Sequence, residues 1–203
     1  MPLTALALNC SLKPSGGEPS STDRMIDVLA GALHERGVRL AETIRLADHR
    51  VKPGVTSDEG EGDDWPALRA RVLAHDILVF GTPIWLGHPC SLAQRVVERM
   101  DAFLSEDDGE GRTPPAGKVA VLAVVGNEDG AHAVTAHLSQ CLSDVGWTVP
   151  ASGSCYWVGE AMRSVNFVDL EEVPDTVADQ AKLVARHAAH LAGLLKASNY
   201  PAG

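Results

Sequence analysis

The sequence predicts an α/β protein, a three-layer sandwich in which a five-stranded parallel sheet carries helices on both faces. Short apolar runs alternate along the chain with segments whose apolar residues recur at helical spacing. The runs are rich in Val, Leu and Ala with little polar alternation, which is typical of strands buried on both sides. Parallel neighbours also need crossover connections, and the helical segments supply them.

Each element is predicted from its own pattern. Five apolar runs, most of them short and bounded by turn residues, are expected to be strands: Leu3–Leu8, Val38–Leu46, Asp76–Thr82, Lys118–Val125 and Thr148–Val158. Apolar side chains three or four residues apart predict helices in five places: Met25 to Leu33, Trp65 to Leu73, Leu92 to Leu104, Ala133 to Val145 and Val177 to Leu195. The order βαβαβαβαβα follows.

Length and composition predict one domain over residues 1–203. The chain is 45% apolar and 22% charged, which is ordinary globular usage. Two acidic, glycine-rich stretches, 52–64 and 105–117, interrupt the pattern, and we expect them to be solvated, mobile loops within that domain.

Several classes of protein are disfavoured. A net charge of −10 disfavours nucleic acid and anionic membranes as partners. No apolar run approaches the roughly 20 residues of a membrane span, and no leader pattern is seen at the N-terminus, so we expect a cytoplasmic protein. The widely spaced cysteines, without a C-x-x-C pair, favour a reducing compartment and no metal site: Cys10, Cys90, Cys141 and Cys155.

Three common phosphate-binding motifs are not found in the sequence. It contains no G-x-x-x-x-G-K-[ST], and no G-x-G-x-x-G follows the first predicted strand. A Cys-x5-Arg phosphatase loop starting at Cys10 fails because Gly16 stands where the arginine is needed. We therefore expect Cys10 to pack at the end of its strand.

In open α/β sheets, ligands bind beyond the carboxyl ends of the strands, so the loops after the first, third and fourth predicted strands are the candidates. The first loop ends at a helix N-terminus, where unpaired N–H groups attract anions. Its hydroxyls would add donors for a phosphate: Ser11, Ser15, Ser20, Ser21 and Thr22. Simple capping of the helix by Ser20 or Ser21 explains the same residues equally well.

The second loop, "FGTPIWLGHPCS", suits a flat ring. Thr82-Pro83 is expected to end the buried strand in a stiff turn, and Gly87 allows close approach of the backbone. Large apolar residues beyond a strand end favour a planar ligand over a hydrophobic lid or a subunit contact, the alternatives for Trp85. They are Ile84, Trp85 and Leu86.

The third loop, "VVGNEDGAHAV", supplies polar groups beside two glycines, Gly126 and Gly130. Asn127 and Asp129 suit the polar edge of a ring, although capping of the next helix explains Asp129 equally well. A phosphate site, a flat apolar slot and a polar edge are together what flavin mononucleotide (FMN) requires.

The "SST" end of the first loop, "GTPIWLG" and "GNEDGA" together resemble the NADPH-dependent FMN reductase family, which has a flavodoxin-like fold. The resemblance implies the strand order 2-1-3-4-5, bound FMN, NADPH or NADH as the electron donor, and a homodimer or homotetramer. It implies that Ser11, Ser21 and Thr22 hold the phosphate, and we add Ser20 from the same loop. It places the ring against Pro83, Ile84, Trp85, Leu86 and Gly87, and its pyrimidine side against Gly126, Asn127, Asp129 and Gly130.

The expected function is therefore an NAD(P)H oxidoreductase that passes a hydride through FMN to a flavin, a quinone or a similar acceptor. Because FMN carries out the hydride chemistry, no catalytic side chain is expected, and the backbone N–H groups from Gly126 to Gly130 are expected to stabilise charge on the reduced ring. A flavodoxin-type one-electron carrier and a non-catalytic module that binds a nucleotide or a partner are the alternatives.

Other residues carry weaker signals. Tyr156 and Trp157 end the fifth predicted strand at the same edge, where they would cover the flavin of this or a neighbouring subunit. Lys13 and Arg24 either assist the phosphate or the 2′-phosphate of NADPH, or face solvent. The isolated histidines are expected at the surface: His88, His187 and His190.

Overall fold

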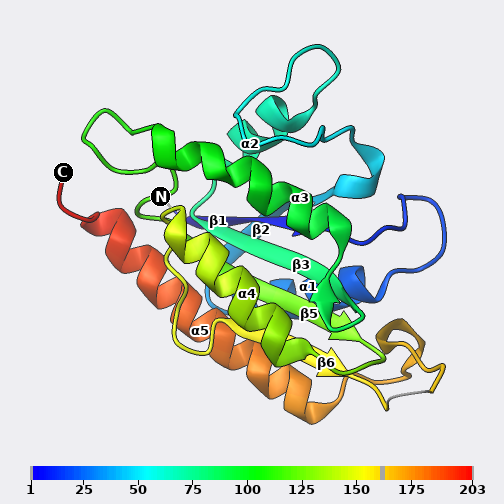
Figure 1. Ribbon diagram of the computed structural model, residues 1–203. Helices are drawn as coiled ribbons and strands as arrows, with labels where there is room; N and C mark the ends of the chain where they lie inside the picture. Colours follow the sequence, from blue (N-terminus) through cyan, green and yellow to red (C-terminus); the bar gives the residue numbers. More distant parts are fainter. Residues whose placement is uncertain (1, 161–162, 203) are drawn as a thin grey trace.

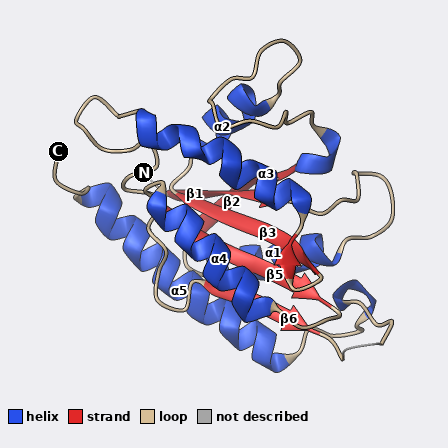
Figure 2. Cartoon of the chain, viewed as in Figure 1, coloured by secondary structure: helices blue, strands red, loops and turns tan. Residues whose placement is uncertain are grey.

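The computed structural model describes residues 2–160 and 163–202, in which a twisted parallel sheet lies between two layers of helices (Figures 1 and 2). The strands are β1 (Leu3–Asn9), β2 (Val38–Arg45), β3 (Ile77–Trp85), β4 (His88–Pro89), β5 (Val119–Gly126) and β6 (Ser154–Val158). The five long strands are parallel in the order β2-β1-β3-β5-β6, which confirms the predicted order. The two-residue β4 pairs antiparallel with β3.

The described residues form five α-helices, of which the first four lie between strands and the last follows β6: α1 (Ser21–His34), α2 (Trp65–Leu73), α3 (Ser91–Met100), α4 (Ala131–Asp144) and α5 (Asp175–Ala197). Single 3-10 turns are η1 (Leu46–Asp48), η2 (Asp101–Ser105) and η3 (Phe167–Asp169). Strand side chains alternate between two apolar clusters. Leu6 and Leu8 of β1 pack on the face covered by α2, α3 and α4, whereas Ala5 and Ala7 pack on the face covered by α1 and α5.

The predicted end of the third strand is wrong. β3 does not stop at Thr82-Pro83 but continues to Trp85 and turns back through Leu86 and Gly87, both with positive φ, into β4. Since β1 ends opposite Gly81, β3 has a neighbour on only one side at Pro83, where β5 still pairs with it. A proline without an N–H donor is tolerated at such an edge.

The fifth predicted strand is shorter than expected. β6 begins at Ser154 instead of Thr148, and Thr148 forms only an isolated bridge to Val119. A turn with a positive φ at Ser152 separates the two segments. Apolar composition alone did not show this break.

Most of the acidic stretch 52–64 is exposed or half-buried, as its composition predicts, but a buried ion pair anchors it to α3. The guanidinium of Arg99 in α3 is completely buried and donates to the carbonyl oxygens of Lys52 and Thr56, at 3.0 and 2.9 Å. It also forms an ion pair of 2.7 Å with Asp63, whose side chain is equally buried. In the second acidic stretch, Arg112 pairs with Asp108 and Glu110 near the surface.

Candidate functional site

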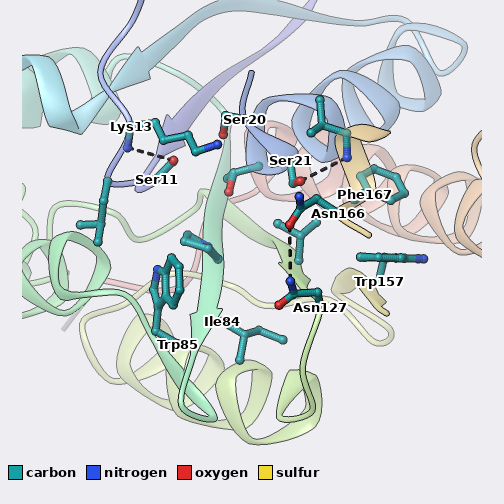
Figure 3. A pocket seen from close by; sticks show the side chains of 16 residues that line it. Ser11, Lys13, Ser20, Ser21, Ile84, Trp85, Asn127, Trp157, Asn166 and Phe167 are labelled. Carbon is teal, nitrogen blue, oxygen red and sulfur yellow. Dashed lines mark hydrogen bonds between the residues drawn. The ribbon is translucent and has the colours of Figure 1, made fainter. Parts of the chain in front are cut away.

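A cleft of about 240 Å³ lies at the carboxyl ends of β1, β3 and β5 (Figure 3). Nine of the thirteen predicted site residues line it: Ser11, Ser20, Ser21, Thr22, Pro83, Ile84, Trp85, Gly126 and Asn127. Gly87, Asp129 and Gly130 line a neighbouring cavity instead, and Leu86, 88% exposed, lines neither. The three predicted loops therefore do meet, around two hollows, and the β3–β4 turn contributes Trp85 to the first and Gly87 to the second.

One end of the cleft is the start of α1. Ser20 is the N-cap, and its hydroxyl accepts a hydrogen bond from the N–H of Asp23 at 3.4 Å. Helix geometry leaves the N–H groups of Ser21 and Thr22 without an intrahelical partner, so they are available to an anion. The capping expectation is confirmed for Ser20, and it does not exclude an anion, because the cap leaves these two amides free within the helix.

The backbone of the first loop is fixed by local bonds. The buried side chain of Asn9 accepts from the N–H of Ser11 at 2.8 Å, which turns the chain out of β1. Thr22 is buried against β3: a Cβ at Gly81 would lie 2.9 Å from its methyl group. Cys10 is buried as predicted, and burial is the main cause that raises the pKa of its thiol. These contacts preorganise the α1 end of the cleft.

The two basic candidates behave differently. Lys13 lines the cleft, with its ammonium group 3.0 Å from the carbonyl oxygen of Pro19 and 3.2 Å from Glu18. Arg24 instead donates to the carbonyl oxygens of Phe167 and Val168, at 2.8 and 3.1 Å, and lies 5.3 Å from the centre of the Phe167 ring. Arg24 therefore anchors a loop, and only Lys13 of this pair faces the cleft.

Aromatic side chains form the walls of the other end. Figure 3 shows Trp85 and Trp157 on opposite sides, with Ile84 between them near the floor. Trp85 is 56% exposed, whereas Ile84 is buried. Trp157 packs against Phe167 with ring centres 5.5 Å apart. An apolar slot with two indole walls is suited to a planar ring.

Five cleft residues were missed by the sequence analysis: Leu12 and Val125 in the predicted loops, and Asn166, Phe167 and Val168, which follow β6. The N–H of Val168 donates to the Ser21 hydroxyl at 3.1 Å, and Asn127 donates weakly to Asn166 at 3.5 Å (Figure 3). The local signal was the pair Asn166 and Asp169, which form a capping box around η3. That signal predicts a turn but does not show that the turn returns to the start of α1.

Glycines hold the β3–β4 turn against the loop after β5. A Cβ at Gly130 would lie 2.7 Å from the Cα of Gly87, and one at Gly126 would lie 2.9 Å from Ile84. The N–H of Gly130 donates to the carboxylate of Asp129 at 3.0 Å. Gly130 is thus needed for close packing. The sequence analysis expected its amide to face the ring, but this amide already donates to Asp129.

The remaining histidines lie outside the cleft. His88 is an exposed residue of the β3–β4 hairpin, and Nδ1 of His187 lies 2.6 Å from the carbonyl oxygen of Ala151. Within residues 2–160 and 163–202, no three His, Cys, Asp or Glu side chains are grouped as a metal site would require.

Residues 3–161 match the sequence model of a family described as NADPH-dependent FMN reductase. The chain belongs to this family. The match confirms the resemblance drawn from the three loops, and with it the enzyme class and the cofactors that the family description names, FMN and a nicotinamide nucleotide.

Two curated relatives have different names. The chain is 32% identical over 179 residues to the 8-demethyl-8-aminoriboflavin-5'-phosphate synthase of Streptomyces davaonensis, covering 83% of this chain and 68% of the relative. It is 37% identical over 171 residues to a Mycobacterium bovis protein named divalent metal cation transporter MntH, but it spans only 25% of that protein's length. No helix in the described part of this chain is long and apolar enough to cross a membrane.

Solved structures agree with the family. RosB with a bound 8-demethyl-8-formylriboflavin-5'-phosphate intermediate is 28% identical, with a TM-score of 0.86 over 98% of this chain and 82% of RosB. The apo form of the NADH:FMN oxidoreductase EMOB is 19% identical, with a TM-score of 0.67 over 93% of this chain and 89% of that one, and supports the fold alone.

Proposed function

We propose that this protein transfers a hydride from NADH or NADPH to FMN held in the cleft, and from there to a flavin, a quinone or a similar small acceptor. The observation that carries the proposal is the convergence, in one cleft, of the free first-turn amides of α1 with the slot between Trp85 and Trp157. The family assignment supports FMN as the molecule that needs both features.

The described residues fit FMN at its anionic end. The phosphate would lie at the start of α1, where it receives the backbone N–H groups of Ser21 and Thr22 and the hydroxyls of Ser11 and Ser20. The Ser21 hydroxyl accepts from Val168 and keeps its own proton to donate. Lys13 would balance part of the charge from the cleft mouth.

The ring end also fits. Pro83, Ile84 and Trp85 would form one wall, with Leu86 and Gly87 of the turn at the edge of the ring, and Trp157 would stand opposite. Gly126 and Asn127 would face the pyrimidine side from the cleft, and Asp129 and Gly130, which line the neighbouring cavity, would stand beside that edge. When bound, FMN supplies the hydride chemistry, so the protein's task is to hold the ring flat and to leave one face open.

The experiment that tests the proposal is anaerobic mixing of the FMN-loaded protein with NADH or NADPH. For the reductase, rapid bleaching of the flavin is expected. Addition of a quinone should then restore the yellow colour of the oxidised flavin. Slow or absent bleaching together with a stable semiquinone under dithionite would favour the one-electron carrier. Protein that stays colourless after incubation with FMN would favour the non-catalytic module.

A second candidate is that the flavin is the substrate. It is favoured by one observation: the 28% identical RosB holds a formylated riboflavin phosphate. Mass spectrometry of the flavin released after turnover separates the two. Unchanged FMN supports the reductase, and a change of mass supports chemistry on the flavin.

Two further expectations belong to this proposal. All four cysteines are free, which supports a cytoplasmic location. The family resemblance supports a homodimer or homotetramer, and sedimentation of the FMN-loaded protein tests the assembly.

A further inference from the structure

A second cavity, of about 470 Å³, is lined by Gly87 of the β3–β4 turn, by residues 129–133 and by Tyr156 and Val158 of β6. Tyr156 and Trp157 are consecutive in β6, so their side chains project to opposite faces of the sheet. Trp157 lines the cleft and Tyr156 lines this second cavity. The FMN site proposed above leaves most of the second cavity without a function.

An aromatic pair stands in this cavity. The Tyr156 hydroxyl lies 3.0 Å from Nε2 of His132, and the two rings are nearly perpendicular with centres 5.3 Å apart. Val158 and the small side chains of Ala131 and Ala133 complete an apolar lining. Aromatic faces stack on bases, and a hydroxyl and an imidazole nitrogen can bond to ribose hydroxyls. This combination suits a purine ribonucleoside.

The position of the cavity relates it to the electron donor. A nicotinamide dinucleotide has two nucleotide halves, and hydride transfer requires only the nicotinamide half beside the flavin. The other half needs a second surface, and the same short turn contributes to both hollows: Trp85 lines the cleft and Gly87, two residues further on, lines the second cavity. The first turn of α4 also lines this cavity, and its N-cap, Gly130, has no side chain to cap it.

The charges of the cavity favour one form of the donor. Its eight lining residues, all of them in the described part of the chain, contain no lysine or arginine, and Asp129 is the charged residue among them. A 2′-phosphate on the ribose normally needs an arginine. We propose that this cavity binds the adenosine half of NADH and that a nucleotide with a 2′-phosphate binds it less tightly. The inference rests on the proposed function, which supplies the dinucleotide.

The test is calorimetric titration of the FMN-loaded protein with ADP-ribose. Ala133→Phe fills the cavity from an exposed position and should weaken binding about tenfold or more, whereas Tyr156→Phe keeps the ring, loses the hydroxyl and should weaken it about threefold. The matched control is His137→Ala on the same helix, whose side chain contacts Gln94 and should leave binding unchanged. ADP-ribose 2′-phosphate should bind about fivefold more weakly than ADP-ribose.

Equal binding of ADP-ribose to the wild type and Ala133→Phe would overturn the inference, as would no binding to the wild type. Tighter binding of the 2′-phosphorylated form would overturn the preference for NADH. The proposed function is tested separately. If neither NADH nor NADPH bleaches the wild-type flavin, the reductase proposal is wrong. The titration with ADP-ribose still shows whether the second cavity binds adenosine. If the reductase function and the adenosine site are both confirmed, Ala133→Phe should raise the KM for NADH and leave kcat and FMN affinity unchanged.

Discussion

Two arginines, Arg99 and Arg24, hold distant loops against the body of the protein, and they do so with different chemistry. Arg99 is fully buried in α3 and combines two carbonyl oxygens with the buried carboxylate of Asp63. Arg24, at the start of α1, donates hydrogen bonds to carbonyl oxygens and lies over the ring of Phe167. Among the described residues, no carboxylate forms an ion pair with it. The Arg99 loop lies away from the cleft, whereas the Arg24 loop lines it.

The different partners of Arg99 and Arg24 imply different effects on stability and on ligand binding. A buried ion pair is costly to break because the partner left behind is an uncompensated charge. Carbonyl oxygens left behind are neutral and can rebond to water at the cleft. We therefore expect Arg99 to act mainly on the folding equilibrium and Arg24 mainly on the shape of the cleft.

The largest effect is expected for Arg99→Met. Removing the guanidinium leaves the Asp63 carboxylate buried, so the free energy of unfolding should fall by about 3–5 kcal/mol in urea titrations. FMN affinity of the folded fraction should not change. Arg112→Met, which breaks pairs nearer the surface, is the control and should cost less than about 1 kcal/mol. Similar losses in both variants would show that burial of the ion pair is irrelevant.

Acid should reveal the same ion pair. Burial alone would raise the pKa of Asp63, but hydrogen bonds from Arg99 and from the backbone N–H groups of Glu59, Lys52 and Trp65 hold it well below its usual range. A lowered pKa in the folded state means that this stabilisation is complete above about pH 4, near the unfolded pKa, and is lost as the pH falls further. Unfolding titrations between pH 5 and pH 2 should show a shallower acid loss for Asp63→Asn than for the wild type, and equal slopes would contradict this assignment.

Arg24→Met should show the opposite pattern to Arg99→Met. Without its anchor, the segment from Phe167 to Leu170 no longer fixes the wall at Trp157 and the bond from Val168 to Ser21. We expect the Kd for FMN, from fluorescence titration, to rise about tenfold, with a loss of about 2 kcal/mol in unfolding free energy. Arg186→Met on the exposed face of α5 is the control. An unchanged Kd would remove this loop from the site.

The smallest effect is expected for Lys13→Ala. Its ammonium group is partly exposed and already forms an ion pair with Glu18, so it should contribute only about two- to threefold to FMN affinity. The salt dependence of binding should flatten at the same time, since one cation near the phosphate is gone. A tenfold or greater loss would make Lys13, rather than the α1 amides, the main phosphate ligand.

The sequence analysis predicted most of the cleft lining where it relied on local chemistry. The "SST" segment at the start of α1 and the apolar "PIW" run were visible because helix starts and strand ends have local signatures. It misplaced the end of β3, because the pairing of Pro83 with β5 and the end of β1 opposite Gly81 are set by neighbours far along the chain. It also missed Phe167 and Val168, which bond to α1 from more than 140 residues away.

By itself, the sequence determined the alternation of strands and helices, the family and the three loops that meet at the cleft, because periodicity and short motifs act over a few neighbouring residues. Tertiary structure alone decided the partners of the buried charges, the separation of the site into two hollows at the Gly87–Gly130 contact, and the loop that closes the cleft. These depend on contacts between distant segments, which form only when the sheet brings its strand ends to one edge.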